Sequence, residues 1–392
     1  MRDPLSEKVK VIKPSGIRKF FDIVSEMPDA ISLGVGEPDF ETPWHIREEG
    51  IYSLERARTH YTSNAGLKEL KEEIANYLNR KFSLSYDPAT EVLVTVGGSE
   101  AIDIAMRAML NPGDEVLIPQ PSYVAYLPCT TLADGVPVII DLQEKNQFKL
   151  TAEELEAAIT PKTKILVLPF PNNPTGSVMD REDLEKIAEV IIRHDIWVVS
   201  DEIYSELSYQ KDHVSIASLP GMAERTIVIN GFSKSYAMTG WRLGYAAGPA
   251  NVISQMTKIH QFCIMCAPTT SQFAAVEALK NGDADVAHMK ETYNQRRRYL
   301  MHAMREMGLD CFEPFGAFYI FPNISRFGMT SDEFATKLLM KEQVAVVPGT
   351  AFGDCGEGFV RISYAYSLER LKKAMERIAR FIKWLEAGEP EE

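Results

Sequence analysis

The chain has few of the features that mark secreted, membrane-spanning and nucleic-acid-binding proteins. Only five of its 392 residues are cysteine, and this odd, scattered set fits a reducing compartment better than a disulfide framework. No apolar run is long enough to cross a bilayer, and the first residues lack the apolar core of a secretory signal. The net charge of −13 disfavours nucleic acid and anionic membranes as main partners. We therefore expect a cytoplasmic protein.

Two further absences narrow the chemistry. Cys263 and Cys266 form a Cys-x-x-Cys pair, but no second pair follows. A structural zinc site normally has four ligands, so we expect no metal and interpret the pair as small, apolar-behaving side chains in a helix. The sequence assigns them no further role. Gly34-Val35-Gly36 lacks the third glycine of a dinucleotide fingerprint, which disfavours a nicotinamide enzyme.

The apolar segments predict an α/β architecture. Hydrophobic residues make up 45% of the chain and charged residues 25%, as in globular proteins with a large core. Continuous apolar runs alternate with helical patterns between about 90 and 250, which indicates a mainly parallel sheet with crossover helices. The expected strands are 92–96, 115–118, 165–168, 196–200, 226–229 and 244–247. Between them, residues 101–110 and 180–194 read as helices, the second with Asp180 as N-cap and Asp183 completing a capping box.

The pattern changes after about residue 286. Three helical segments and three short apolar strands follow, which predicts a second, smaller α+β domain. The expected helices are 288–307, 331–341 and 368–385, and the expected strands are 317–321, 344–347 and 359–364.

Four polar or glycine positions lie shortly after predicted strands. They are Gly97, Asn173, Asp201 and Lys234. In parallel sheets, ligands bind beyond the carboxyl ends of the strands. The sequence therefore predicts that these residues share one site.

Lys234 and Asp201 are the residues with the clearest chemistry. A lysine at the end of a buried strand is desolvated, which lowers its pKa and suits it to a Schiff base with an aldehyde cofactor. Arg242, eight residues on, is placed to hold a phosphate of that cofactor. A buried carboxylate such as Asp201 needs a partner, although a helix N-cap would also explain an aspartate after a strand.

Other candidates have an equally plain structural interpretation. Gly97-Gly98-Ser99 either binds a phosphate at a helix N-terminus or is a tight turn. Arg361 interrupts an apolar strand, and a buried arginine is stabilised by a carboxylate partner. That carboxylate could belong to a structural ion pair within the protein or to a substrate. Tyr123 taken alone is more often a packing residue than a ring-stacking one.

Taken together, these residues resemble a known family. Residues 230–242, with Lys234 and Arg242, are similar to the cofactor-lysine segment of pyridoxal-phosphate (PLP) aminotransferases of class I, fold type I. The likeness extends from about 15 to 385 and is strongest for the prokaryotic branch of aromatic, acetyl-diaminopimelate and some aspartate aminotransferases, as in residues 237–242 and 316–322. The positions that carry it in the right order are Tyr61, Asn173, Asp201, Tyr204, Lys234, Arg242 and Arg361.

The resemblance implies a particular division of the chain. Residues 46–285 would form a large PLP-binding domain with a mainly parallel seven-stranded sheet covered by helices. Residues 286–392 would form the small C-terminal α+β domain, and residues 1–45 would pack with it. The bonds Gln120–Pro121 and Asn173–Pro174 would be cis. The active sites would be shared between the subunits of a homodimer.

The resemblance also implies roles for the catalytic and ring-binding residues. Lys234 would carry PLP as a Schiff base and then act as general base. Asp201 would pair with the pyridine nitrogen, and Tyr123 would stack on the ring. Tyr204 and Asn173 would bind the phenolic oxygen.

Phosphate and substrate contacts follow from the same likeness. Gly98, Ser99, Ser233 and Arg242 would hold the phosphate, with Tyr61 reaching the phosphate of the neighbouring subunit. Ser233 or the backbone would stand in for a phosphate-binding hydroxyl that some relatives carry where this chain has Gly231. The substrate residues would be Ile17, Gly36, Asn173 and Arg361.

The implied function is transfer of an amino group from an L-amino acid to a 2-oxo acid by a ping-pong mechanism, with 2-oxoglutarate as the expected acceptor. Ser99 stands where aspartate-specific relatives of the branch carry a lysine, which favours an aromatic, acetyl-diaminopimelate or broad donor range. Two alternatives stay open. A PLP-dependent carbon–sulfur β-lyase would share Lys234 and Asp201, and a non-catalytic relative would bind PLP or a partner protein without turnover.

Overall fold

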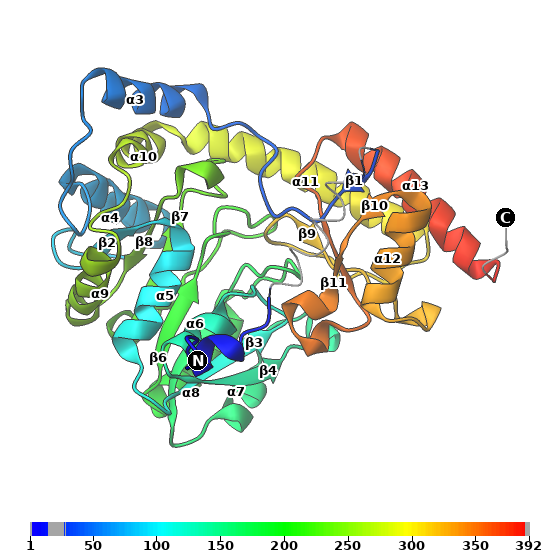
Figure 1. The fold of residues 1–392 in the computed structure, drawn as a ribbon, viewed down its shortest axis with the longest axis horizontal. Coiled ribbons are helices and arrows are strands. Elements are labelled where there is room, and N and C mark those ends of the chain that lie inside the picture. Colours follow the sequence, from blue (N-terminus) through cyan, green and yellow to red (C-terminus); the bar gives the residue numbers. More distant parts are fainter. Residues whose placement is uncertain (1, 15–26, 28, 389–392) are drawn as a thin grey trace.

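A seven-stranded sheet forms the centre of the larger part of the molecule in this computed structural model, which describes residues 2–14, 27 and 29–388 (Figure 1). Every strand runs parallel to its neighbours except β8, which is antiparallel to both of the strands beside it. The prediction of a mainly parallel sheet is therefore confirmed. In spatial order the strands are β2 (Val92–Thr95), β8 (Gly244–Ala247), β7 (Thr226–Gly231), β6 (Trp197–Asp201), β5 (Thr163–Leu168), β3 (Glu115–Gln120) and β4 (Val136–Asp141).

The central strands are buried on both faces, which explains their unbroken apolar sequences. Val199 of β6 packs in one core cluster with Ile227 of β7, whereas Val198 packs on the opposite face. Successive side chains of a strand point to opposite faces, so a sheet covered on both sides needs apolar residues at every position.

The edge strand β4 was not predicted. Val136 and Ile139 are 44% and 39% exposed, and β4 pairs only with β3. Proline is tolerated on such an edge, and Pro137 interrupts the sequence pattern. A proline argues against a strand wherever it breaks an apolar segment, so the segment 136–140 was not predicted although Val138, Ile139 and Ile140 are apolar.

Helices cover both faces of this sheet. One face carries α5 (Gly97–Met109), α6 (Tyr126–Leu132) and α9 (Ala250–Cys263). The other carries α4 (Lys68–Phe82), α10 (Thr269–Asn281), α7 (Ala152–Ala158) and α8 (Arg181–Arg193), with α3 (Trp44–Glu55) packed on α10. The capping box at the start of α8 is present as predicted, because Asp180 accepts from the Asp183 backbone and Asp183 from that of Asp180.

The C-terminal part is a smaller α+β unit. Its antiparallel sheet has the order β11 (Val347–Pro348), β12 (Val360–Ser363) and β9 (Tyr319–Ile320). The strand expected at 344–347 is two strands, because β10 (Val344–Ala345) pairs instead with β1 (Ile31–Ser32). The helices here are α11 (Asp283–Glu306), α12 (Ser331–Glu342) and α13 (Leu368–Glu386).

Two features bear on the predicted domain limits, which stay predictions. The limit at 285/286 falls in the first turn of α11, a single helix that runs from the large sheet's helices toward α13 (Figure 1). The described part of residues 1–45 contacts both regions. Strand β1 joins β10, whereas α1 (Glu7–Lys10) lies against α6, with Lys8 bonded to Asp134. Among the residues described, no helix is both long and apolar enough to span a membrane.

Candidate active site

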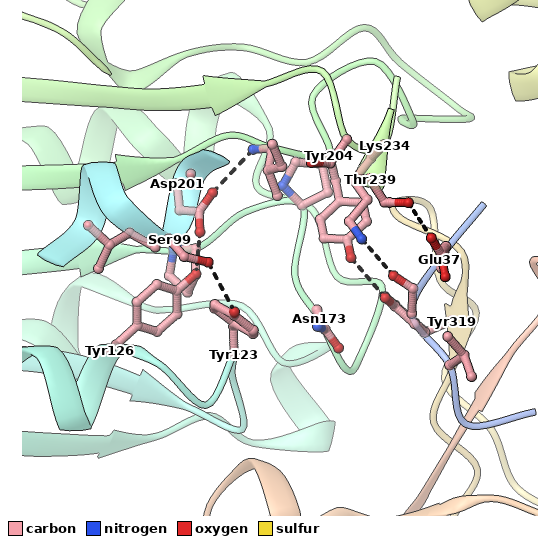
Figure 2. A pocket seen from close by; sticks show the side chains of 18 of the residues that line it. Glu37, Ser99, Tyr123, Tyr126, Asn173, Asp201, Tyr204, Lys234, Thr239 and Tyr319 are labelled. Atoms are coloured by element: carbon pink, nitrogen blue, oxygen red, sulfur yellow. Dashed lines mark hydrogen bonds between the residues drawn. The ribbon is translucent and has the colours of Figure 1, made fainter. Parts of the chain in front are cut away.

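A cavity of about 440 Å³ lies at the carboxyl edge of the parallel strands, between the large sheet and the C-terminal unit. Figure 2 shows side chains from both regions pointing into it. Ile17 lies outside the described residues, and Tyr61 does not line this cavity. The predicted site residues that do line it are Gly36, Gly98, Ser99, Tyr123, Asn173, Asp201, Tyr204, Ser233, Lys234, Arg242 and Arg361.

Lys234 follows β7, and its amine points across the cavity to the segment after β1. Its Nζ donates to the Gly36 carbonyl at 2.6 Å and lies 6.0 Å and 5.8 Å from the ring centroids of Tyr204 and Phe318. Burial among these groups lowers the pKa of Lys234 to about 8. About a tenth of the amine is therefore neutral at pH 7, far more than for a lysine with an ordinary pKa, and a nucleophilic lysine reacts in this neutral form.

Asp201 is the last residue of β6 and is 7% exposed. Its Oδ2 accepts from the Tyr126 hydroxyl at 2.7 Å and its Oδ1 from the Ile203 backbone at 3.2 Å. Burial raises the pKa of this carboxyl group. A turn rather than a helix follows it, so the helix N-cap interpretation of Asp201 is wrong. No basic side chain of the described ranges forms an ion pair with it, and the carboxylate is left facing the cavity.

Arg361 reaches the cavity from β12 and is 2% exposed. Its guanidinium donates to Asn173 Oδ1 at 2.8 Å and to the Gly34 carbonyl, and its carbon lies 4.4 Å from the centroid of the Tyr319 ring. Its buried Nε has no hydrogen-bond partner. Since the described part of the chain supplies no carboxylate within ion-pair distance, the structural ion pair considered for Arg361 is absent. A buried, open guanidinium is suited to bind an anion from solution.

The remaining predicted residues of the phenolic-oxygen site lie beside Arg361. Asn173 follows β5 and bonds Arg361 directly. Tyr204 lies in the turn after Asp201, and its hydroxyl is 2.8 Å from the hydroxyl of Tyr319. The two cis bonds expected from the resemblance, Gln120–Pro121 and Asn173–Pro174, are both cis, and Phe170–Pro171 is cis as well.

The start of α5 forms a polar corner at the opposite end of the cavity. Gly97 has φ +77°, and a Cβ there would lie 2.8 Å from Arg242 Nη2, so the guanidinium lies directly on the first turn of the helix. The hydroxyls of Ser99 and Tyr123 are 3.3 Å apart, and Ser233 also faces the cavity. Free backbone N–H groups, a helix dipole and a guanidinium together favour a phosphate.

Sequence reasoning missed several cavity residues, among them Tyr126, Tyr319 and Glu37. Tyr126 donates to Asp201, and its ring meets that of Tyr123 edge to face at 5.7 Å. Its position three residues after Tyr123 was the only available signal. Tyr319 sits in an apolar strand with nothing to set it apart. Glu37 accepts a hydrogen bond from Thr239 at the cavity rim, and its sequence context resembles an ordinary turn.

Tyr61 and the cysteine pair lie together on a different surface. Tyr61 is 80% exposed and lines a shallow depression with Cys266 and Pro268. Cys263 is exposed at the end of α9, and Cys266 lies beyond that helix. The expectation that both cysteines are helical is therefore wrong for Cys266. Within the described ranges, no cluster of three His, Cys, Asp or Glu side chains could hold a metal.

The fold and this site define an aminotransferase. The family "Aminotransferase class I and II" matches residues 28–378, and the chain belongs to it. A putative aminotransferase of Bacillus subtilis, YugH, is 54% identical over 97% of this chain and 99% of its own length. An aspartate aminotransferase of Pyrococcus abyssi is 47% identical over 97% of this chain and 98% of its own length. A crystal structure described as Pyrococcus protein-A1 superposes with a TM-score of 0.95 at 46% identity, covering 96% of this chain and 98% of its own.

The branch suggested by the sequence is confirmed by further relatives. An aromatic-amino-acid aminotransferase of Thermococcus litoralis and a probable N-acetyl-LL-diaminopimelate aminotransferase of B. subtilis are each 44% identical over 97% of this chain, and the alignments cover 98% and 96% of those proteins. The chain is therefore a transaminase of this branch.

Proposed function

We propose that this transaminase moves an amino group from an L-amino acid to a 2-oxo acid, with 2-oxoglutarate as acceptor, and that it holds PLP through a Schiff base on Lys234. The observation that carries the proposal is the convergence of three ionisable groups on one cavity, the buried Asp201 and Arg361 and the half-buried Lys234. Lys234, Asp201 and Arg361 all face it, and none has an oppositely charged side chain of the described chain within ion-pair distance.

The cavity suits each part of PLP. The phosphate belongs at the first turn of α5, beside Ser99, Ser233 and Arg242. The carboxylate of Asp201, buried and open on one side, suits a protonated ring nitrogen, because such a charge would lower the cost of keeping it ionised. Tyr204 and Asn173 would hold the phenolic oxygen, and Tyr123 would stack on the ring, since all three line the cavity. Bound PLP supplies an electron sink for the charge left when the substrate Cα–H bond breaks.

The chain's own residues then bind, orient and move a proton. Arg361 takes the substrate α-carboxylate through its guanidinium, which the rings of Tyr319 and Phe352 hold in place. Lys234 Nζ is the group that would take the proton from the substrate Cα as general base and give it back as general acid. The same steps reversed with a second oxo acid give ping-pong kinetics.

The exposed surface around Tyr61 supports a homodimer with shared sites. Tyr61 is the reaching residue proposed for the neighbouring subunit's phosphate, and its large side chain is itself 80% exposed. Large exposed apolar side chains mark association surfaces. Ile17 is proposed as a substrate contact, and the protein is proposed to be cytoplasmic.

The donor range is proposed to be aromatic, acetyl-diaminopimelate or broad rather than strictly aspartate. Position 99 carries a hydroxyl that bonds Tyr123 instead of a lysine. The basic side chains of the described residues that line the cavity are Lys234, Arg242 and Arg361, and each already has a role at the cofactor or the α-carboxylate.

A panel of amino donors against 2-oxoglutarate tests the proposal. Glutamate formation would be measured with aspartate, phenylalanine, tyrosine and acetyl-diaminopimelate, and read as ratios of kcat/KM. We expect turnover with at least one aromatic or acetylated donor and a visible absorbance in the purified protein. Pyruvate and ammonia from a cysteine conjugate without added oxo acid would support the carbon–sulfur lyase instead. Bound PLP with no turnover on the panel would support a non-catalytic relative.

A further inference from the structure

Tyr319 occupies a position that no sequence argument assigned. It lies on β9 of the C-terminal sheet and is fully buried. Its ring stacks under the guanidinium of Arg361, with 4.4 Å between the guanidinium carbon and the ring centroid. Its hydroxyl is 2.8 Å from the hydroxyl of Tyr204, and Figure 2 shows this bond next to the Lys234–Gly36 bond. Tyr319 therefore contacts both Arg361, the proposed substrate residue, and Tyr204, the proposed cofactor residue.

The hydroxyl of Tyr319 has almost no freedom. A Cβ on Gly36 would lie 2.4 Å from it, so the glycine backbone closes one side while Tyr204 closes another. The same Gly36 carbonyl accepts from Lys234 Nζ. Strand pairing fixes the ring as well, because Tyr319 is in register with Ser363 on β12, the strand that carries Arg361. The backbone therefore sets the positions of Tyr319 and Arg361 together.

The direction of the Tyr319–Tyr204 hydrogen bond follows from counting protons. Burial raises the pKa of both phenols, so each carries one proton. If Tyr204 gives its proton to the phenolic oxygen of PLP, as the proposed function requires, its oxygen is left as an acceptor. Tyr319 must then be the donor. A hydroxyl that accepts a hydrogen bond becomes a stronger donor itself.

We propose, on the basis of the proposed function, that Tyr319 is a positioning residue with two separable parts. Its hydroxyl holds the Tyr204 O–H toward the cofactor's phenolic oxygen, and its ring holds the guanidinium of Arg361 in place for the substrate carboxylate. The hydroxyl acts on the cofactor only through Tyr204.

The hydroxyl's role is tested by Tyr319→Phe in the holoenzyme, using the pH dependence of the visible absorbance of the lysine-bound cofactor without substrate. A donor to the phenolic oxygen favours its ionised form. Loss of the Tyr319 donor should therefore raise the pH at the midpoint of the absorbance change by about 0.4–1 unit. That shift is the equivalent of one ordinary hydrogen bond. The other ionisable groups that line the cavity are unchanged in Tyr319→Phe. They are Glu37, Tyr123, Tyr126, Asp201, Tyr204, Lys234, Arg242 and Arg361.

The ring's role is tested by comparing KM values. Tyr319→Phe keeps the ring, so KM for the amino donor should change less than about threefold, whereas Tyr319→Leu should raise it about tenfold through loss of a desolvated cation–π contact. Tyr245→Phe is the matched control, because its buried hydroxyl has no hydrogen-bond partner in the described chain and does not line the cavity. It should change neither the midpoint nor KM.

Tyr204→Phe and the double variant decide whether Tyr319 acts through Tyr204. The single change should raise the midpoint by more than Tyr319→Phe does, and adding Tyr319→Phe to it should give no further rise. An unmoved midpoint in Tyr319→Phe, or an equal extra rise in the double variant, would overturn the inference alone. Wild-type protein without visible absorbance after incubation with PLP would overturn the proposed function, and this inference with it. Circular dichroism and thermal melting of the PLP-free variants check that each one folds.

Discussion

Two adjacent carboxylates at the end of β6 have opposite environments. Glu202 is 0% exposed and accepts from Ser200 at 2.9 Å, Ser215 at 2.6 Å and His213 at 3.0 Å. Asp201 is nearly as buried but has only Tyr126 and a backbone amide, and it faces the cavity. Complete satisfaction is typical of a structural group. A buried charge with few hydrogen-bond partners is suited to bind a ligand group of opposite charge.

The arginines show the same contrast. Arg296 and Arg297 are buried on α11 and pair with Asp39 at 2.7 Å and Glu313 at 2.8 Å. Arg361 is more deeply buried, yet it has only neutral partners and an unpaired Nε. Burial alone therefore does not distinguish functional from structural charges in this protein. The distinguishing property is whether the fold supplies the counter-charge.

Replacing the cavity lysine should have the largest effect. Lys234→Ala removes the group that holds the cofactor and moves the proton, so we expect loss of the lysine-bound cofactor absorbance and a fall in kcat of at least about 10²–10⁴-fold. Lys71→Ala is the control, because Lys71 is also buried but bonds the Ala89 carbonyl away from the cavity. A Lys234→Ala protein with normal turnover would refute the Schiff-base proposal.

The two carboxylates at the end of β6 should respond differently to neutralisation. Asp201→Asn removes the charge proposed to face the ring nitrogen and should lower kcat/KM by about 10²–10³-fold, as expected for breaking a buried ion pair. Glu202→Gln should mainly destabilise the fold, by about 1–3 kcal/mol, as measured by urea unfolding. Equal losses of activity in the two variants would show that Asp201, which faces the cavity, and Glu202, which is fully hydrogen-bonded, do not differ in function.

The arginine contrast predicts a change in substrate binding. Arg361→Lys keeps the charge but loses the planar fork, so KM for the amino donor should rise about 10–100-fold, the equivalent of about 1.5–3 kcal/mol for a charged hydrogen bond. Arg297→Lys should lower the melting temperature and leave KM within about twofold. An unchanged KM for Arg361→Lys would show that the α-carboxylate binds elsewhere.

The pH dependence of cofactor attachment should show the smallest effect. Burial destabilises the Lys234 ammonium, so the neutral fraction grows as pH rises through the lowered pKa of about 8. Stopped-flow mixing of PLP-free protein with PLP should give a rate that rises up to about tenfold between pH 7 and 9 and then levels off. A rate that still rises several-fold between pH 9 and 10 would indicate an ordinary, solvated lysine.

The sequence predicted most of the central fold because its strands are buried on both faces. Six of the seven strands were predicted from their apolar runs, whereas Pro137 interrupts the apolar segment of β4, which the structure places at a half-exposed edge. The split between β10 and β11 was equally hidden, since the partner of β10 is β1, more than three hundred residues earlier. Local pattern shows that a segment is extended but does not show which strand it pairs with.

The candidate site divides in the same way. Residues that follow strands were found because parallel strands end at one edge of the sheet. Tyr126 and Tyr319 were not, because their partners lie 75 and 115 residues away. No periodicity or spacing records a contact of that kind.

By itself, the sequence determined which residues are costly to bury and therefore need a reason: Lys234, Asp201 and Arg361. The tertiary structure alone decided that their charges stay open while those of Glu202 and Arg297 are satisfied. The physical reason is that the counter-charge of a buried group comes from whichever distant segments pack against it. The same residue type in the same local pattern can therefore be either a structural anchor or a ligand site.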